Sequence, residues 1–133
     1  MYTTKAKINF FDCDPAGIMF FGNVYKLCHS AYEDFIHSLS LDFDFWHENH
    51  FAVPILHSEA DYLQPLKTGD EITIEMSVLL LKKYMFELYF EIKNKNGELC
   101  DRVKTTHIFI DRETKKKIEM NNKIYNALQE HLK

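Results

Sequence analysis

Two carboxylates separated by a single residue stand near the start of the chain, at Asp12 and Asp14. Pro15 disfavours a helical backbone at Asp14 and has no N–H of its own, so we expect Asp14 in an extended or turn conformation. Gly17 permits a sharp bend. A short apolar run then ends at Asn23, which can act as the N-cap of the amphipathic pattern that follows. The spacing predicts a carboxylate in an irregular loop just before a helix.

A carboxylate in this position can act as a nucleophile or as a general base. The first backbone N–H groups of a helix carry partial positive charge and can stabilise an oxyanion that forms nearby. A structural interpretation competes with this one, because Asp12 and Asp14 can also serve only to close a hydrogen-bonded turn. Spacing alone favours the turn, since the same pattern occurs in many loops without chemistry.

The residues around the two carboxylates form a longer pattern: Asp12-Cys13-Asp14-Pro15-Ala16-Gly17-Ile18, the aromatic pair Phe20-Phe21, and Gly22-Asn23. This pattern resembles the N-terminal motif of the 4-hydroxybenzoyl-CoA thioesterase family of hotdog-fold hydrolases. The similarity covers most of the chain, is weakest over the C-terminal helix, and continues through Ala60-Asp61-Tyr62-Leu63-Gln64-Pro65-Leu66, Gly69-Asp70 and Lys82-Lys83. The resemblance implies a hotdog fold and thioesterase activity, with Asp14 as the catalytic carboxylate.

The resemblance also implies how such a site works. Asp14 would attack the thioester carbonyl directly or activate the water that does so. Backbone N–H groups around Phe21, Gly22 and Asn23 would hold the oxyanion. The chain departs from the family at Phe21, where many members have His or Tyr, and at His29, where relatives commonly have an acid. His29 can orient water, protonate the leaving thiolate or simply pack, and a single histidine on a half-apolar helix face is more often structural.

Coenzyme A carries phosphates, which bind to cations at a protein surface. Lys82 and Lys83 match a basic pair in the family and are the candidates for CoA binding. Without the resemblance this pair would indicate only a solvated turn, which is also our interpretation of the lysines at 115–117. Apolar walls for an aromatic or a short to medium aliphatic acyl group are expected from Phe20, Phe21, Tyr25 and Tyr32.

Length and composition narrow the remaining choices. The 133 residues predict one domain, spanning 1–133, and the net charge of −4 argues against a nucleic-acid partner. Three widely spaced cysteines, at positions 13, 28 and 100, fit neither a disulfide framework nor a zinc site, and we expect a reducing cytoplasm. The N-terminus lacks an apolar signal segment, and no apolar run is long enough to span a membrane.

Hydrophobic periodicity predicts an α+β architecture. Period-two alternation indicates strands over 4–11, 53–63, 71–80, 84–93 and 98–110, with Phe10 on the inward side of the first strand. Asn96-Gly97 indicates a hairpin between the last two. Helical spacing begins at Asn23 and gives the longest helix, residues 40–50 form a short helix or a turn-rich segment, and Asn121 or Asn122 can cap a final helix. An antiparallel sheet wrapped around one long central helix is the hotdog fold.

These observations combine into one functional hypothesis. We expect a metal-independent acyl-CoA thioesterase without a cofactor, which releases CoA and a free acid; an acyl-carrier-protein thioester is another candidate substrate. Open sheet edges are usually covered or paired, and hotdog proteins dimerise edge to edge, so we expect a homodimer or homotetramer. Two alternatives stay open: a hotdog enoyl-CoA hydratase or dehydratase, and a non-catalytic acyl-CoA-binding hotdog protein.

Overall fold

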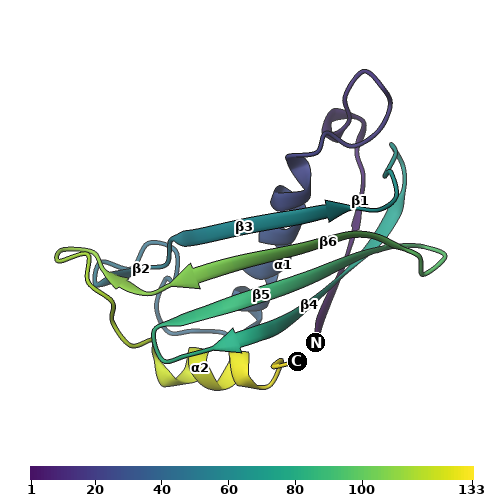
Figure 1. Cartoon of the computed structure of the whole chain (residues 1–133). Helices are drawn as coiled ribbons and strands as arrows, with labels where there is room; N and C mark the ends of the chain where they lie inside the picture. Colours follow the sequence, from purple (N-terminus) through teal and green to yellow (C-terminus); the bar gives the residue numbers. More distant parts are fainter.

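A curved five-stranded antiparallel sheet, in the order β1-β4-β5-β6-β3, wraps around one long helix, α1 (Asn23–Ser38) (Figure 1). The computed structural model describes all residues, 1–133. The strands of this sheet are β1 (Tyr2–Lys7), β3 (Ile55–Tyr62), β4 (Glu71–Leu81), β5 (Met85–Asn94) and β6 (Leu99–Ile108). The remaining elements are the 3-10 helix η1 (Phe10–Asp12), the two-stranded pair β2 (Phe51–Ala52) and β7 (Ile110–Asp111), and the helix α2 (Asn122–Gln129). The predicted α+β hotdog architecture is confirmed.

The core lies between α1 and the concave face of the sheet. Alternate residues of β4 and β5 are buried, as their period-two pattern predicts: Ile72, Ile74, Met76 and Val78 on β4, and Phe86, Leu88, Phe90 and Ile92 on β5. Helical spacing predicts a buried stripe of Val24, Leu27, Cys28, Ala31, Phe35 and Leu39, of which Leu27 and Leu39 are only partly buried. Tyr32 and Ile36, from the neighbouring row, are buried with the other four. The helix is therefore fixed on the sheet along its whole length.

The start of the chain differs from the prediction. β1 ends at Lys7, and Phe10 is 82% exposed in the 3-10 helix instead of facing the core. The cause is local, because a carboxylate oxygen of Asp12 accepts a hydrogen bond from the Asn9 N–H at 2.9 Å and closes a tight turn there. This turn ends the period-two alternation and rotates the following aromatic side chains outward.

The ends of the helices were predicted with mixed success. Asn23 is not the N-cap of α1; Gly22 occupies that position, and Asn23 is the first helical residue. The Asn23 side chain instead donates a hydrogen bond to the Asp12 carbonyl at 2.8 Å, which ties the loop to the helix. Asn121 does cap α2, since its side chain accepts from the Lys123 N–H at 2.8 Å. Residues 40–50 form turns and no helix.

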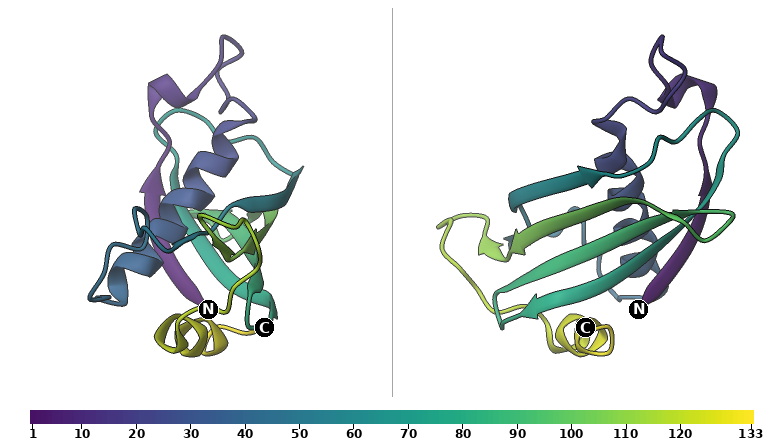
Figure 2. Two further views of the ribbon diagram at one scale, coloured as in Figure 1. Left: turned by 90° about the vertical axis from the view of Figure 1, so that its left-hand side faces the viewer. Right: turned by 45° about the vertical axis from the view of Figure 1, so that its right-hand side comes forward.

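The two ends of the sheet have different neighbours. α2 and both chain termini lie at one end, whereas the loop 8–22, which leads into α1, lies at the other (Figure 2). β3 hydrogen-bonds only to β6, so its second edge is open. Neither helix has the length and apolar character that crossing a membrane requires.

Candidate active site

Asp12 holds the loop in place. The residue is buried. One carboxylate oxygen accepts the hydrogen bond from the Asn9 N–H, and the other lies 3.5 Å from the Lys26 ammonium. Its carbonyl accepts hydrogen bonds from the Phe20 N–H, at 2.9 Å, and from the Asn23 side chain. All of these contacts tie the loop to itself or to the first turns of α1. The geometry gives Asp12 a structural role.

Asp14, the predicted catalytic carboxylate, lies half-buried at the start of a tight turn. Its Oδ1 accepts a hydrogen bond from the Ala16 N–H at 2.9 Å, and its carbonyl accepts one from the Gly17 N–H at 2.9 Å. Gly17 has a φ of 85°, which few residues other than glycine adopt. Oδ2 of Asp14 has no hydrogen-bond partner within the chain, and Asp14 lines neither of the two cavities described below. One oxygen therefore shapes the turn while the other is available.

Backbone donors are present at the entrance of α1. The Asn23 N–H donates to the Phe20 carbonyl at 2.9 Å, but the N–H groups of Phe21 and Gly22 have no acceptor in the chain. The hydroxyl of Tyr62, on β3, donates to the Phe21 carbonyl at 2.9 Å. Because a peptide group is planar and trans, fixing this carbonyl also fixes the direction of the Gly22 N–H. Two of the three predicted oxyanion donors are thus available, and Tyr62 orients one of them.

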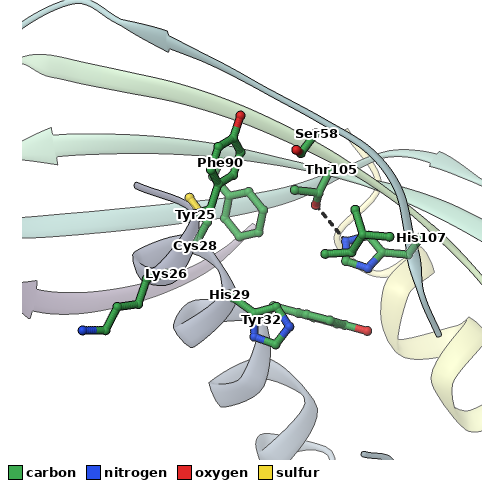
Figure 3. Close-up of a pocket in the computed structure, with 10 residues that line it drawn as sticks. Tyr25, Lys26, Cys28, His29, Tyr32, Ser58, Phe90, Thr105 and His107 are labelled. Carbon is green, nitrogen blue, oxygen red and sulfur yellow. Dashed lines mark hydrogen bonds between the residues drawn. The ribbon is translucent and has the colours of Figure 1, made fainter. Parts of the chain in front are cut away.

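A first cavity of about 310 Å³ separates the first turns of α1 from strands β3, β5 and β6. It is lined by Tyr25, Lys26, Cys28, His29, Tyr32, Ile55, Ser58, Phe90, Thr105 and His107 (Figure 3). The walls are largely aromatic and aliphatic, and the hydroxyls and imidazoles supply a few polar groups. Such a mixture is typical of a small-ligand site in which apolar contacts provide affinity and polar groups provide orientation.

The two histidines of this cavity differ in their surroundings. His29 is exposed at its rim, where the ring packs against Tyr32 and Trp46 at centroid distances of 5.5 and 5.6 Å. His107 is 1% exposed, stacks on Phe86 at 4.7 Å, and lies with Nε2 2.7 Å from the Thr105 hydroxyl. Burial, reinforced by the nearby His29, lowers the pKa of His107 to about 3. His107 is therefore neutral at physiological pH.

A second cavity, of about 300 Å³, lies beside the loop and the helix entrance. It is lined by Ile18, Met19, Phe21, Tyr62, Leu63, Gln64, Pro65, Leu66 and Asp101. Asp101 is 2% exposed and is the only carboxylate that lines it. Burial raises the pKa of this carboxyl group to about 6. Of the two cavities, this one is lined both by an acidic residue and by Phe21 of the helix entrance.

The predicted CoA-binding pair lies elsewhere. Lys82 and Lys83 are exposed in the turn between β4 and β5, next to α2, where the Lys83 carbonyl accepts from the Met120 N–H at 2.8 Å. Within one chain this turn is at the opposite end of the sheet from the loop 8–22 (Figure 1). The structure brings the helix entrance, Tyr62 and the two cavities together, but it does not bring Lys82 and Lys83 to them.

Four residues that shape the site were not predicted from the sequence: Tyr62, Asp101, Thr105 and His107. Each lies on β3 or β6 in the half of the alternation that faces α1. One signal was available, because a carboxylate and a histidine at inward positions of a strand are costly unless they have a purpose. Which cavity each would face depended on strand pairing that the sequence does not state.

The curved antiparallel sheet around one central helix, with cavities beside the N-terminus of that helix, defines a hotdog-fold protein. Comparison with known proteins then identifies the family. Residues 8–128 match the thioesterase-like superfamily. The chain belongs to this superfamily, and it is a thioester hydrolase of the acyl-CoA thioesterase type.

Similar proteins share nearly the full length of the chain. A 1,4-dihydroxy-2-naphthoyl-CoA hydrolase from Rippkaea orientalis is 29% identical over 131 residues, covering 96% of this chain and 94% of the relative. One from Prochlorococcus marinus is 31% identical over 134 residues, covering 95% and 86%. The crystal structure of a 1,4-dihydroxy-2-naphthoyl-CoA thioesterase from Synechocystis superposes with a TM-score of 0.90 at 24% identity, covering 96% and 95%. A Staphylococcus aureus protein in complex with CoA superposes with a TM-score of 0.89 at 14% identity, covering 99% and 85%.

Proposed function

We propose that this protein hydrolyses an aromatic acyl-CoA thioester of the 1,4-dihydroxy-2-naphthoyl type at the entrance of α1. The observation that carries the proposal is the pair of N–H groups of Phe21 and Gly22 that have no acceptor in the chain; the Tyr62 hydroxyl, bound to the Phe21 carbonyl, fixes the direction of the Gly22 N–H. Donors that are fixed before the reaction stabilise the oxyanion that develops when a thioester carbonyl is attacked. The names of the similar proteins support an aromatic acyl group.

The acyl group occupies the first cavity. Its volume of about 310 Å³ is at the lower end of the range for small-ligand sites, which suits a ring system or a short chain better than a long fatty acyl chain. The rings of Tyr25, Tyr32 and Phe90 provide aromatic contacts. The Tyr32 hydroxyl and His107 Nδ1 are both buried without a hydrogen-bond partner. Both atoms have almost no accessible surface, so the polar groups that the cavity offers to a hydroxylated aromatic ring come from Ser58 and Thr105.

Asp14 supplies the catalytic carboxylate in this proposal, through its available Oδ2. It attacks the carbonyl carbon or activates the attacking water, and the thiolate of CoA leaves. His29, at the rim of the first cavity, is placed to orient water or to protonate the departing sulfur, and Asn23 supports the loop instead of donating to the oxyanion. A thiolate is a good leaving group, so most of the required stabilisation falls on the oxyanion.

A second copy of the chain completes the assembly. β3 has an open edge and exposes Ile55, Leu56 and Tyr62, which suits pairing with another β3 in a homodimer. Lys82 and Lys83 can contact the CoA phosphates of this site only from another copy, because within one chain they lie at the other end of the sheet. We place the protein in the cytoplasm, in keeping with its three unpaired cysteines. Light scattering of the purified protein tests the dimer.

A thiol-release assay over a panel of thioesters tests the activity. The panel contains naphthoyl-CoA with and without hydroxyl groups, benzoyl-CoA, hexanoyl-CoA, palmitoyl-CoA and one acyl-carrier-protein thioester. We expect the hydroxylated aromatic esters to have the highest kcat/KM. Asp14→Asn should lower kcat by at least about 100-fold, while Asp34→Asn, an exposed carboxylate on α1, serves as the matched control. Near-native turnover by Asp14→Asn would refute the role of Asp14, and a preference for palmitoyl-CoA would refute the proposed substrate class.

A further inference from the structure

Asp101 is a buried carboxylate without a partner. It is 2% exposed, its Oδ2 accepts no hydrogen bond, and it forms no ion pair. Folded proteins nearly always satisfy buried polar atoms, and a buried carboxylate in particular is kept only where something compensates for its desolvation. Nothing in the fold needs this charge, because Asp101 ties no turn and caps no helix. Asp12, in contrast, is buried and fully engaged.

The position of Asp101 connects it to the helix entrance. Asp101 and Tyr62 are directly opposite each other in the β3–β6 ladder, so their side chains are neighbours on the face of the sheet toward α1. The Tyr62 hydroxyl reaches the Phe21 carbonyl at 2.9 Å. Asp101, Tyr62 and Phe21 all line the second cavity. The second cavity therefore has Asp101 and a residue of the helix entrance in the same wall, next to the peptide groups whose N–H donors have no acceptor in the chain.

We propose that Asp101 is a second catalytic carboxylate of this site, the general base that takes a proton from the hydrolytic water. The inference rests on the proposed function, because it assumes that a thioester carbonyl binds at the Phe21 and Gly22 N–H groups. The other walls of the second cavity are largely apolar, so a water held there has Asp101 as its strongest acceptor. Asp14 lines neither cavity and uses one oxygen for its own turn, so we assign to its free Oδ2 the attack on the carbonyl carbon and to Asp101 the deprotonation of the water.

The proposed step is balanced without any added reagent. Oδ2 of Asp14 forms a bond to the carbonyl carbon, and the electron pair of the carbonyl bond moves to the oxygen, which the N–H groups stabilise. When the carbonyl re-forms, the carbon–sulfur bond breaks, CoA leaves as a thiolate that takes a proton from bulk water, and Asp14 is held in a mixed anhydride. The water oxygen then forms a bond to the anhydride carbonyl carbon while one water proton moves to the Asp101 carboxylate. The bond to Asp14 breaks, the free acid leaves, and Asp101 returns its proton to bulk water.

The groups around Asp101 leave its charge uncompensated. Cys28 faces it from α1, Tyr62 faces it from β3, and Cys100 precedes it on β6. Burial and the Asp101 charge raise the pKa of Cys28, and burial is the main cause of the raised pKa values of Tyr62 and Cys100, so all three are neutral at pH 7. No cation faces Asp101. Burial raises the pKa of Asp101 to about 6, and a base works best when its pKa is near the working pH.

The test compares Asp101→Asn with the wild type on the best ester of the panel. We expect kcat to fall by at least about 100-fold at pH 7.5 while KM changes little. The wild-type rate should fall on the acid side of about pH 6, and the residual rate of Asp101→Asn should lack this acid limb. Asp61→Asn is the matched control, because Asp61 is the neighbour of Tyr62 on β3 but is exposed and lies 3.5 Å from Arg102.

Chemical rescue separates a catalytic role from a structural one. Asp101→Ala opens space next to the second cavity, and added formate can place a carboxylate there, so we expect formate to restore part of the lost kcat in a saturable manner. Circular dichroism should show both variants folded, since Asn and Ala remove a buried charge. Two outcomes would overturn this inference and leave the proposed function standing. One is a near-native kcat with an unchanged acid limb in Asp101→Asn. The other is a loss of kcat in both variants that formate does not reverse. Absence of thiol release by the wild type over the whole panel would overturn the proposed function and this inference together.

Discussion

Lowering the pH from 7.5 to 5 should destabilise the folded chain through His107. An imidazole in an unfolded chain has a pKa of about 6.5. In the fold the ring is 1% exposed, its Nδ1 has no partner, and burial with the nearby His29 lowers the pKa to about 3. Above pH 6.5 the ring is neutral in both states and costs nothing. Between pH 6.5 and 3 the imidazole is protonated in the unfolded chain but not in the folded chain, so the free energy of unfolding decreases as the pH falls.

The size of the effect follows from the difference between the two pKa values. Each pH unit below 6.5 costs about 1.4 kcal/mol until the folded-state pKa is reached. At pH 5 the unfolded chain is 1.5 units below its pKa, which corresponds to a loss of about 2 kcal/mol. A typical domain is stable by only about 5–15 kcal/mol, so a loss of this size is measurable with urea. In the wild type the raised pKa of Asp101 offsets much of it, and the His107 contribution is therefore read from the difference between the wild type and a His107 variant.

Urea unfolding followed by circular dichroism at pH 7.5, 6 and 5, at one fixed protein concentration, measures this loss. His107→Gln keeps a polar group near Thr105 but cannot bind a proton, so its stability should depend less on pH by about 2 kcal/mol over this range. His57→Gln is the control, because His57 is exposed and contacts Glu59 at 3.1 Å. The raised pKa of Asp101 has the opposite effect, because it increases the free energy of unfolding as the pH falls. This contribution is the same in the wild type and the variant, so it cancels in their difference. Parallel pH profiles for wild type and His107→Gln would refute the reasoning.

Two further predictions concern the groups that shape the helix entrance. Tyr62→Phe removes the hydrogen bond to the Phe21 carbonyl. The loss of about 1 kcal/mol should lower kcat by about 5- to 10-fold, with little change in KM, in steady-state kinetics. An unchanged kcat would mean that the Gly22 N–H is oriented without Tyr62. Asp12→Ala removes the buried acceptor of the Asn9 N–H, which should lower the free energy of unfolding by about 1–3 kcal/mol in urea; a native urea midpoint would contradict the structural role of Asp12.

Local patterns were enough to predict most of the architecture. Alternation along β4 and β5 and the helical stripe of α1 report burial within one element, because side-chain direction is set by the period of that element. The Asn96-Gly97 hairpin was predicted from turn chemistry, and Gly97 does adopt a φ of 80°. Asn121 or Asn122 was predicted as the cap of α2 because an Asn side chain can accept from the first turn, and Asn121 occupies that position. The prediction that Phe10 faces inward was wrong, because Asp12 closes a turn with Asn9 and so interrupts the alternation.

The sequence by itself determined that a single curved sheet would hold one long helix, and that a proline-bent acidic loop would precede this helix. It could not determine what faces the helix entrance, because that depends on the pairing of β3 with β6. Tyr62 and Asp101 are far apart in the chain and become neighbours only through this ladder. The same pairing buries Asp101 without a partner and brings it to the second cavity. Packing of the helix against the sheet, and not any local motif, decided which of the many carboxylates is buried without a partner.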